Sequence, residues 1–512
     1  MSFKPAFLAV PGLALFASAA QASIDETINT AVGAATGPFV SFIFSPFPGT
    51  SFPWIVMWLV IAATIFTLYF GFIQFRAFPH SIALVAGKYS DPNDAGEVSH
   101  FQALATALSG TVGLGNIAGV AVAVSIGGPG ATFWMILAGL MGMASKFTEC
   151  TLGVKYRNEY ANGTVSGGPM YYLSKGLTAQ GKGGLGKVLA ILFSIFCVLG
   201  ALGGGNMFQA NQAHAQITNI VGDYPGWITG IVFAAIVFAV IVGGLQSIAQ
   251  VTEKIVPLMA VIYCGAALII ILMNIDKLGW AFGQIFSGAF TGLGIAGGLV
   301  GALIQGFKRA AFSNEAGVGS AAIAHSAVKT KEPITEGFVS LLEPFIDTVV
   351  ICTMTALVIV ITGVMTIDPD TGLYVWDEAA GRIATVDNAS GVALTSAAFG
   401  STISWFPYVL AIAVILFAFS TMISWSYYGL KAWTYMFGEG KSKELTFKVI
   451  FCIFVVIGAA MNLGPVIDFS DAAIFAMALV NIFGLYFLMP IVKAELTSYQ
   501  SRLKSGEIKK FA

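Results

Sequence analysis

Charged residues are scarce in this sequence. They make up only 10% of its 512 residues, whereas soluble proteins average roughly 25%. Hydrophobic residues account for 57%, and the mean hydropathy is +0.83. Charge-free runs of the roughly 20 residues that a helix needs to cross a bilayer recur along almost the whole chain. We therefore predict an all-α integral membrane protein without a separate soluble domain, and the net charge of −1 gives no hint of nucleic acid as a partner.

Cysteine and histidine are also scarce, and neither forms a ligand pattern. The five cysteines show no C-x-x-C spacing, and the four histidines are scattered. We therefore expect no disulfide framework, no zinc site and no cofactor. No His/Cys/Asp cluster or Ser–His pair falls at the predicted membrane midplane, which argues against a membrane enzyme.

The start of the chain has the features of a secretory signal. Residues 1–22 contain one lysine, a short apolar core and Ala-Gln-Ala before Ser23, a pattern typical of a cleaved signal peptide. The alternative is a retained N-terminal helix. Cleavage would leave the mature N-terminus outside the cytoplasm.

Charge-free apolar segments predict eleven transmembrane helices. They lie at residues 53–75, 101–126, 130–145, 187–211, 226–244, 255–274, 288–326, 336–364, 403–428, 446–463 and 472–492. The seventh segment is too long for one plain crossing, because at about 1.5 Å per residue it would reach nearly twice the thickness of the bilayer. We expect it to be broken or to extend into solvent.

Lysine and arginine predict the orientation. Alternate loops and the C-terminal tail, residues 493–512, hold 22 of the 25 Lys and Arg residues, and the other side keeps only Lys4, Lys277 and Arg382. Positive residues concentrate on the cytoplasmic side of a membrane. The sequence therefore predicts a bacterial inner-membrane protein with a periplasmic N-terminus and a cytoplasmic C-terminus.

The stretch "SGTVGLGNIAGVA", residues 109–121, resembles a dinucleotide-binding loop because it fits G-x-G-x-x-A. Such a loop follows a strand and is answered by an acidic residue about 20 positions later. Here the preceding residues are helical in character, and the next acidic residue is Glu149. We therefore reject the cofactor reading.

The same glycines interrupt a helix inside the bilayer, where broken helices occur only around buried sites or cavities. A break bares amides for an anion and carbonyls for a cation. This would suit a zwitterionic substrate with a sodium ion. The alternative is that these glycines merely allow close packing between membrane helices.

A second glycine-rich stretch supports the site. "GVGSAA", residues 317–322, echoes "GLGNIA", residues 113–118, and each lies in the first helix of a five-helix block. Residues 101–274 and 288–492 would then form two inverted repeats, preceded by one extra helix at 53–75. Matching interruptions in two inverted halves point to a transporter's midplane site.

Six motifs resemble the alanine or glycine:cation symporter family, the sodium:alanine symporters, over most of the chain from about residue 50. They are "ALSGTVGLGNIAGVA" (107–121), "GGPGATFWM" (127–135), "GGPMYYL" (167–173), "GGGNMFQANQ" (203–212), "KRAAFSNEAGVGSA" (308–321) and "FSTMISWSYYG" (419–429). The start of the chain also resembles the sodium-linked D-alanine/glycine permeases of marine Gram-negative bacteria. The resemblance implies the five-plus-five inverted-repeat fold of the leucine-transporter type and inward symport of alanine or glycine with sodium, with D-alanine as a further candidate.

The resemblance also implies residue roles at the first break. The amides of Gly113, Leu114 and Gly115 would hold the substrate carboxylate. The side chains of Thr111 and Asn116 would supply oxygens nearby. Gly204 and Gln209 would face the substrate from another helix, although a buried glutamine could equally satisfy helix backbone groups.

The second break and the segment at 403–428 complete the expected pocket. Asn314 would accept from the substrate ammonium, Phe312 would pack on its methyl group beside Ser313, and Trp425 would close the pocket. Glu315, Glu343 and Asp347 are either functional acids or members of structural ion pairs, with Lys308 and Arg309 the candidate partners of Glu315.

A sodium site is expected between the first break and residues 420–421. Its ligands would be the carbonyl oxygens of Ser109 and Val112 and the hydroxyls of Ser420 and Thr421, and Thr421 would also contact the substrate. The alternative is that these hydroxyls bond the carbonyl one turn back. A proton-coupled transporter and a passive pore for small solutes remain the competing functions.

Overall fold

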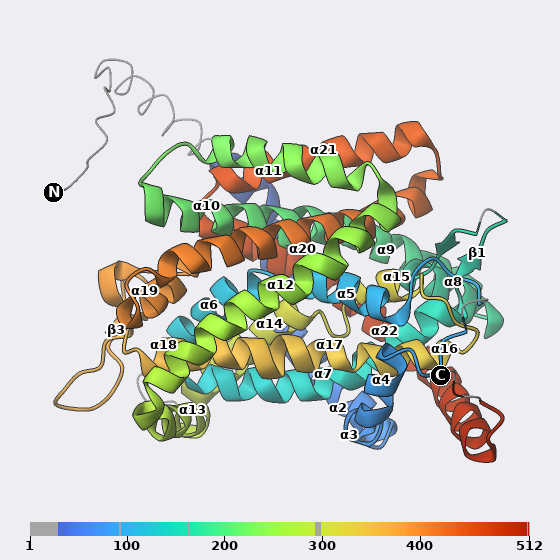
Figure 1. The fold of residues 1–512 in the computed structure, drawn as a ribbon, viewed down its shortest axis with the longest axis horizontal. Coiled ribbons are helices and arrows are strands. Elements are labelled where there is room, and N and C mark those ends of the chain that lie inside the picture. Colours follow the sequence, from blue (N-terminus) through green and yellow to red (C-terminus); the bar gives the residue numbers. More distant parts are fainter. Residues whose placement is uncertain (1–28, 92–93, 162, 292–297, 509, 511–512) are drawn as a thin grey trace.

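The computed structural model describes residues 29–91, 94–161, 163–291, 298–508 and 510. The predicted signal at 1–22 lies outside these residues. The described chain is mostly helical, and its long helices run side by side through the length of the molecule (Figure 1). Five helices are long and apolar enough to cross a membrane, and a sixth candidate is a pair bent at a break. The five are Gly183–Val221, Gly244–Met273, Pro333–Ile361, Phe406–Phe437 and Leu463–Ser505.

Each of the eleven predicted segments contains helix. Five of them are each largely one unbroken helix: α7 (Gly130–Lys155), α11 (Gly226–Ile241), α12 (Gly244–Met273), α20 (Phe406–Phe437) and α21 (Lys441–Ala460). A sixth unbroken helix, α22 (Leu463–Ser505), runs well past its predicted end. The first segment is divided, because α2 (Trp54–Tyr69) and α3 (Ile73–Arg76) are separated by Phe72, which has a left-handed backbone. The remaining segments are interrupted. The prediction of an all-α membrane protein is thus confirmed.

The first predicted break is present. Helix α5 (His100–Thr111) ends before a short turn, and the chain resumes as a π-helical turn, η1 (Gly115–Gly119), and helix α6 (Val120–Gly127). The two halves meet at an angle of 51°. Ser99 begins α5 with a reciprocal cap, in which its side chain accepts from the Gln102 amide and the Gln102 side chain accepts from the Ser99 amide.

The second predicted break lies between α14 (Gly298–Asn314) and α15 (Ala321–His325). Three residues in this break have a left-handed backbone: Glu315 (φ 56°), Gly317 (φ 82°) and Gly319 (φ 92°). Glycine adopts this conformation freely, but a glutamate does so at a cost in energy. From residue 298 on, the seventh segment is therefore two helices joined by an irregular turn.

Two further segments contain π-helical turns. In the fourth segment, η2 (Gly203–Met207) lies between α9 (Gly183–Leu202) and α10 (Phe208–Val221). The eighth segment is a succession of short helical pieces: α16 (Pro333–Ser340), α17 (Leu342–Pro344), η4 (Phe345–Cys352) and α18 (Thr353–Ile361). Such turns are frequent at functional sites because they change which side chains face inward.

The sequence did not predict several short elements, which are too brief or too amphipathic to form a membrane span. Residues 29–43 are helical, and two hairpins pair β1 with β2 and β3 with β4. The other unpredicted elements are α4 (Phe78–Val85), α8 (Pro169–Ala179), α13 (Leu278–Thr291), α19 (Val392–Thr402), β1 (Asn158–Glu159), β2 (Val165–Ser166), β3 (Trp376–Asp377), β4 (Arg382–Ile383), η3 (Ile275–Lys277) and η5 (Val386–Asn388).

The outer ends of the two broken helices are joined. Val98, just before α5, pairs in parallel with Val328, just after α15, and the Lys329 amide donates to the Val98 carbonyl at 2.8 Å. The guanidinium of Arg157 bridges the same two strands by donating to the carbonyls of Ala95 and Val328 at 2.8 and 2.6 Å. The two breaks are therefore held in one structural unit.

Candidate functional site: a cavity between two broken helices

Side chains support the bared backbone at the first break. The Gly113 amide donates to Asn116 Oδ1 at 2.8 Å, and the Leu114 amide donates to Gln209 Oε1 at 3.0 Å. Gln209 Nε2 in turn donates to the Gly204 carbonyl at 2.9 Å. The Gly115 amide is different, because no described residue accepts a hydrogen bond from it. It is the bared donor of this break.

Glycine is required at position 113 by the closeness of its neighbours. A Cβ atom there would lie 2.4 Å from Thr421 Oγ1 and 3.1 Å from Gln209 Oε1. Gly115 lies against the second broken helix, since its Cβ would meet Ser313 Cα at 3.4 Å and Phe312 Cδ1 at 3.5 Å. These glycines bring three helices to the same point.

A small, largely enclosed cavity lies where the two broken helices meet. Its lining residues come from α5, η1, η2, α10, α14, α20, α22 and the second break: Gly110, Thr111, Gly115, Gly204, Gln209, Phe312, Glu315, Trp425 and Ile474.

Trp425 forms the wall of the cavity on α20 and is 1% exposed. Its ring packs directly on the backbone of η2, because a Cβ on Gly205 would lie 2.2 Å from Trp425 Cγ. Its indole Nε1 donates to Glu315 Oε1 at 3.0 Å. The ring is thus fixed on one side by a glycine and on the other by a carboxylate.

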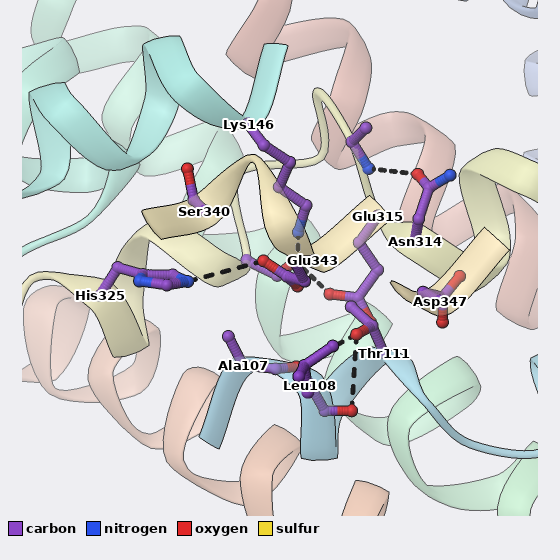
Figure 2. A network of polar contacts seen from close by, with 12 residues as sticks. Ala107, Leu108, Thr111, Lys146, Asn314, Glu315, His325, Ser340, Glu343 and Asp347 are labelled. Atoms are coloured by element: carbon purple, nitrogen blue, oxygen red, sulfur yellow. Dashed lines mark hydrogen bonds and ion pairs between the residues drawn. The ribbon is translucent and has the colours of Figure 1, made fainter. Parts of the chain in front are cut away.

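Glu315 faces the cavity and is 2% exposed. In Figure 2 its side chain extends towards Thr111 of the first broken helix. The predicted alternative, an ion pair with Lys308 or Arg309, is wrong. Both cations pair with Asp471, Lys308 Nζ at 3.0 Å from Asp471 Oδ2 and Arg309 through its Nη2.

Glu343 belongs to a buried ion pair. Its Oε1 lies 2.9 Å from Lys146 Nζ, and both side chains are fully buried (Figure 2). His325 Nε2 lies 3.5 Å from the other carboxylate oxygen. His325 Nδ1 is also 2.5 Å from Glu336, which His100 of α5 contacts at the same distance. The structural reading of Glu343 fits this arrangement.

Asp347 connects the two breaks through neutral donors. Asn116 Nδ2 donates to its Oδ2 at 2.7 Å, and Ser313 Oγ donates to its Oδ1 at 2.8 Å. Thr348 Oγ1 also donates to Oδ1, at 2.7 Å. Because Asn116 accepts from the Gly113 amide, one chain of hydrogen bonds runs from the first break to the second.

Some predicted substrate residues lie outside the cavity lining. Asn116 is turned towards Asp347, and the amides of Gly113 and Leu114 already have partners within the chain. Asn314 Nδ2 donates to Thr348 Oγ1 at 2.9 Å, and its Oδ1 accepts from the Ala316 amide at 2.9 Å. It lines a separate space beside α2 instead of this cavity.

Three of the four predicted sodium ligands, Ser109, Ser420 and Thr421, meet at the contact between α5 and α20. Thr421 Oγ1 donates to the Ser109 carbonyl at 3.0 Å, and Ser109 Oγ donates to the Ser420 carbonyl at 2.7 Å. The Ser420 hydroxyl donates to the Phe417 carbonyl one turn back at 3.0 Å. The Val112 carbonyl accepts from no described residue, so it is available to a cation.

Comparison with known proteins decides the family. The family model described as the sodium:alanine symporter family matches residues 39–512. The chain belongs to this family. It is therefore a sodium-coupled amino-acid symporter that crosses the membrane several times, and the expectation that it is not an enzyme is confirmed.

Relatives match over nearly their full lengths. The sodium/alanine symporter AgcS of Methanococcus maripaludis is 40% identical over 458 residues, which are 89% of this chain and 96% of the relative. The probable sodium/glutamine symporter GlnT of Bacillus subtilis is 33% identical over 446 residues, 86% of this chain and 87% of the relative.

A solved structure shows the fold. The crystal structure of MhsT in complex with L-phenylalanine superimposes with a TM-score of 0.53 at 14% identity, covering 80% of this chain and 99% of that one. This likeness, together with the two breaks, confirms the predicted leucine-transporter-type fold.

Proposed function

We propose that this protein imports small neutral amino acids, alanine or glycine with D-alanine as a further candidate, together with sodium by alternating access. The observation that carries the proposal is the small cavity between the two breaks. Phe312, Trp425 and Ile474 close it on its apolar sides. A short side chain fits such a space, whereas a long one would collide with Trp425, which cannot move into Gly205.

The first break would hold the substrate carboxylate. Gly115, whose amide has no acceptor among the described residues, lines the cavity together with Thr111. The Thr111 hydroxyl now donates to the Ala107 carbonyl at 3.2 Å, which is a long bond that a substrate oxygen can replace. The amides of Gly113 and Leu114 would join the site when Asn116 and Gln209 turn towards the substrate.

The coupling sodium would lie between α5 and α20. The carbonyl oxygens of Ser109 and Val112 and the hydroxyls of Ser420 and Thr421 are the hard oxygen ligands that such a cation prefers. When the Ser420 and Thr421 hydroxyl protons rotate away from their present acceptors, both oxygens can ligate the ion. The sodium would then fasten α20 to the end of α5, next to the cavity.

The central experiment is uptake into proteoliposomes. Vesicles that contain the purified protein should accumulate labelled alanine above equilibrium under an inward sodium gradient, and should fail to do so when choline replaces sodium. Uphill uptake that persists in choline would contradict sodium coupling and indicate proton coupling. Uptake that never exceeds equilibrium would indicate a passive pore.

Substrate size can be tested at the apolar wall. A Cβ at Gly204 would lie 2.5 Å from Ile474 Cδ1 and 3.4 Å from Phe312. Gly204→Ala should therefore reduce alanine uptake more than glycine uptake, and Ile474→Ala should admit larger neutral amino acids. Equal changes for glycine and alanine in both variants would contradict this placement of the substrate side chain.

The orientation is part of the proposal. We propose a bacterial inner-membrane protein with the N-terminus in the periplasm, after a cleaved signal at 1–22, and the lysine-rich C-terminus in the cytoplasm. A fluorescent reporter that folds only in the cytoplasm should be active when fused after Ala512. Activity of a periplasm-specific reporter at that position would reverse the topology.

A further inference from the structure

Glu315 is an acid whose charge has no partner. Among the cavity-lining residues that the structure describes it is the one that carries an ionisable carboxylate. Its Oε1 accepts from the Trp425 indole at 3.0 Å, and its Oε2 accepts from the Ser320 hydroxyl. Both donors are neutral. A carboxylate has about four lone-pair positions, so each oxygen can accept a further hydrogen bond.

The neighbouring cations are committed elsewhere. Lys146 pairs with Glu343 at 2.9 Å, and Lys308 and Arg309 pair with Asp471. No ion pair to Glu315 occurs in the part of the chain that the structure describes. Burying a charge without an opposite charge is costly, so a cation that enters the cavity would be favoured there.

The backbone holds this acid in place at a cost. Glu315 has φ 56°, in the left-handed region that non-glycine residues rarely adopt. Its amide still closes the last turn of α14 by donating to the Ala311 carbonyl at 3.1 Å. Strained positions of this kind cluster at functional sites, and this one directs the carboxylate across the cavity towards the first break.

We propose that Glu315 binds the ammonium group of the transported amino acid, a role that rests on the proposed function. The ammonium offers three donors and the missing positive charge. The substrate carboxylate then points to the Gly115 amide on the other side of the cavity. The two breaks therefore recognise opposite ends of one zwitterion, and the amino acid is distinguished from an uncharged or anionic analogue by Glu315.

The test compares alanine with lactate, in which a hydroxyl replaces the ammonium. Inhibition constants of both are measured against sodium-driven uptake of labelled alanine in proteoliposomes. In the wild type, alanine should inhibit far more strongly than lactate. Glu315→Gln should raise the inhibition constant of alanine at least tenfold and change that of lactate by less than twofold. The ratio of the lactate constant to the alanine constant should therefore fall.

Matched variants separate binding from structure. Glu149→Gln removes a different buried carboxylate, one that accepts from Asn481 at 3.0 Å and does not line the cavity; it should keep the wild-type ratio. Trp425→Phe removes the indole donor from Glu315 but keeps the carboxylate, so alanine should still inhibit more strongly than lactate, even where uptake falls. A Glu315→Gln protein with an unchanged ratio would overturn the proposal.

A measurement on the wild-type protein tests the proposal even if Glu315→Gln does not fold. A hydrophobic carbodiimide adds to a buried carboxyl group and leaves a stable N-acylurea, which peptide mass spectrometry locates. Saturating alanine with sodium should slow modification of Glu315 at least fivefold, and lactate should not. Absence of protection by alanine would overturn the proposal, whereas wild-type vesicles that take up no alanine would instead contradict the proposed function.

Discussion

The two helix breaks present polar groups in different ways. At the first break, side-chain oxygens of Asn116 and Gln209 satisfy the amides of Gly113 and Leu114. At the second break, Glu315 itself carries the polar group, on a left-handed backbone with glycines at 317 and 319. The first break offers a backbone amide, that of Gly115, and the second offers the carboxylate of Glu315.

This difference suits the two breaks to opposite ends of a zwitterion. A bared amide suits a carboxylate, and a carboxylate suits an ammonium. The inverted repeat places both beside one cavity, and Asp347 links them through Asn116 and Ser313. A substitution at either break should therefore alter the geometry of the other break. The size of this change should depend on which of these hydrogen bonds is lost.

The largest effect is expected at Gly113. In Gly113→Ala the new Cβ would lie 2.4 Å from the Thr421 hydroxyl, so the first break cannot keep its shape. Sodium-driven alanine uptake should fall to the level of empty vesicles. Gly119→Ala is the matched control, because its Cβ would meet nothing nearer than the Leu114 carbonyl at 4.0 Å. Equal loss in both variants would mean that helix propensity, not the break, decides the outcome.

The second-largest effect is expected at Asp347. In Asp347→Asn an NH₂ group faces either the Asn116 amide or the Ser313 and Thr348 hydroxyls, so buried donors lose their acceptor. Such losses cost about 1–3 kcal/mol, which should lower alanine affinity by a factor of about 5 to 150. Isothermal titration of the detergent-purified protein would measure this. Near wild-type affinity would show that the breaks are independent.

A smaller and more selective effect is expected at Thr421. Its hydroxyl meets the Ser109 carbonyl, so Thr421→Ala should raise the sodium concentration for half-maximal uptake several-fold. Asn314→Ala should leave the sodium dependence unchanged, because Asn314 contacts Thr348 and the Ala316 amide instead. Uptake measured against sodium concentration would decide, and a shift in Asn314→Ala alone would reverse the assignment.

The smallest effect is expected at Ser313. Ser313→Ala removes one donor from Asp347 Oδ1, which keeps its bond from Thr348. A single hydrogen bond contributes about 0.5–1.5 kcal/mol, so alanine affinity should fall only a few-fold in the same titration. A loss as large as that of Asp347→Asn would show that the link to the second break carries most of the coupling.

Sequence alone could predict the breaks because glycines mark them. Six of the substrate residues that the family resemblance predicts line the cavity: Thr111, Gly115, Gly204, Gln209, Phe312 and Trp425. The short helices α4, α8, α13 and α19 could not be predicted in the same way, since a length of about two to four turns is too short to span a membrane.

The environment of Glu315 could not be predicted because it depends on distant residues. Arg309 is drawn away by Asp471, 162 positions later in the chain. Asn116 finds Asp347 at a separation of 231 residues. Hydropathy and local spacing contain no information on such pairings. From the sequence, Glu315 is therefore equally suited to an ion pair and to a substrate-binding site.

The contact between Trp425 and Gly205 has a consequence for the evolution of substrate range. The ring is held between the backbone of one helix and a carboxylate of another, so the pocket's size is a joint property of three segments. Truncating the tryptophan alone would enlarge the space but release Glu315. A relative that evolves to transport bulkier substrates would have to change Trp425, Gly205 and the orientation of Glu315 together.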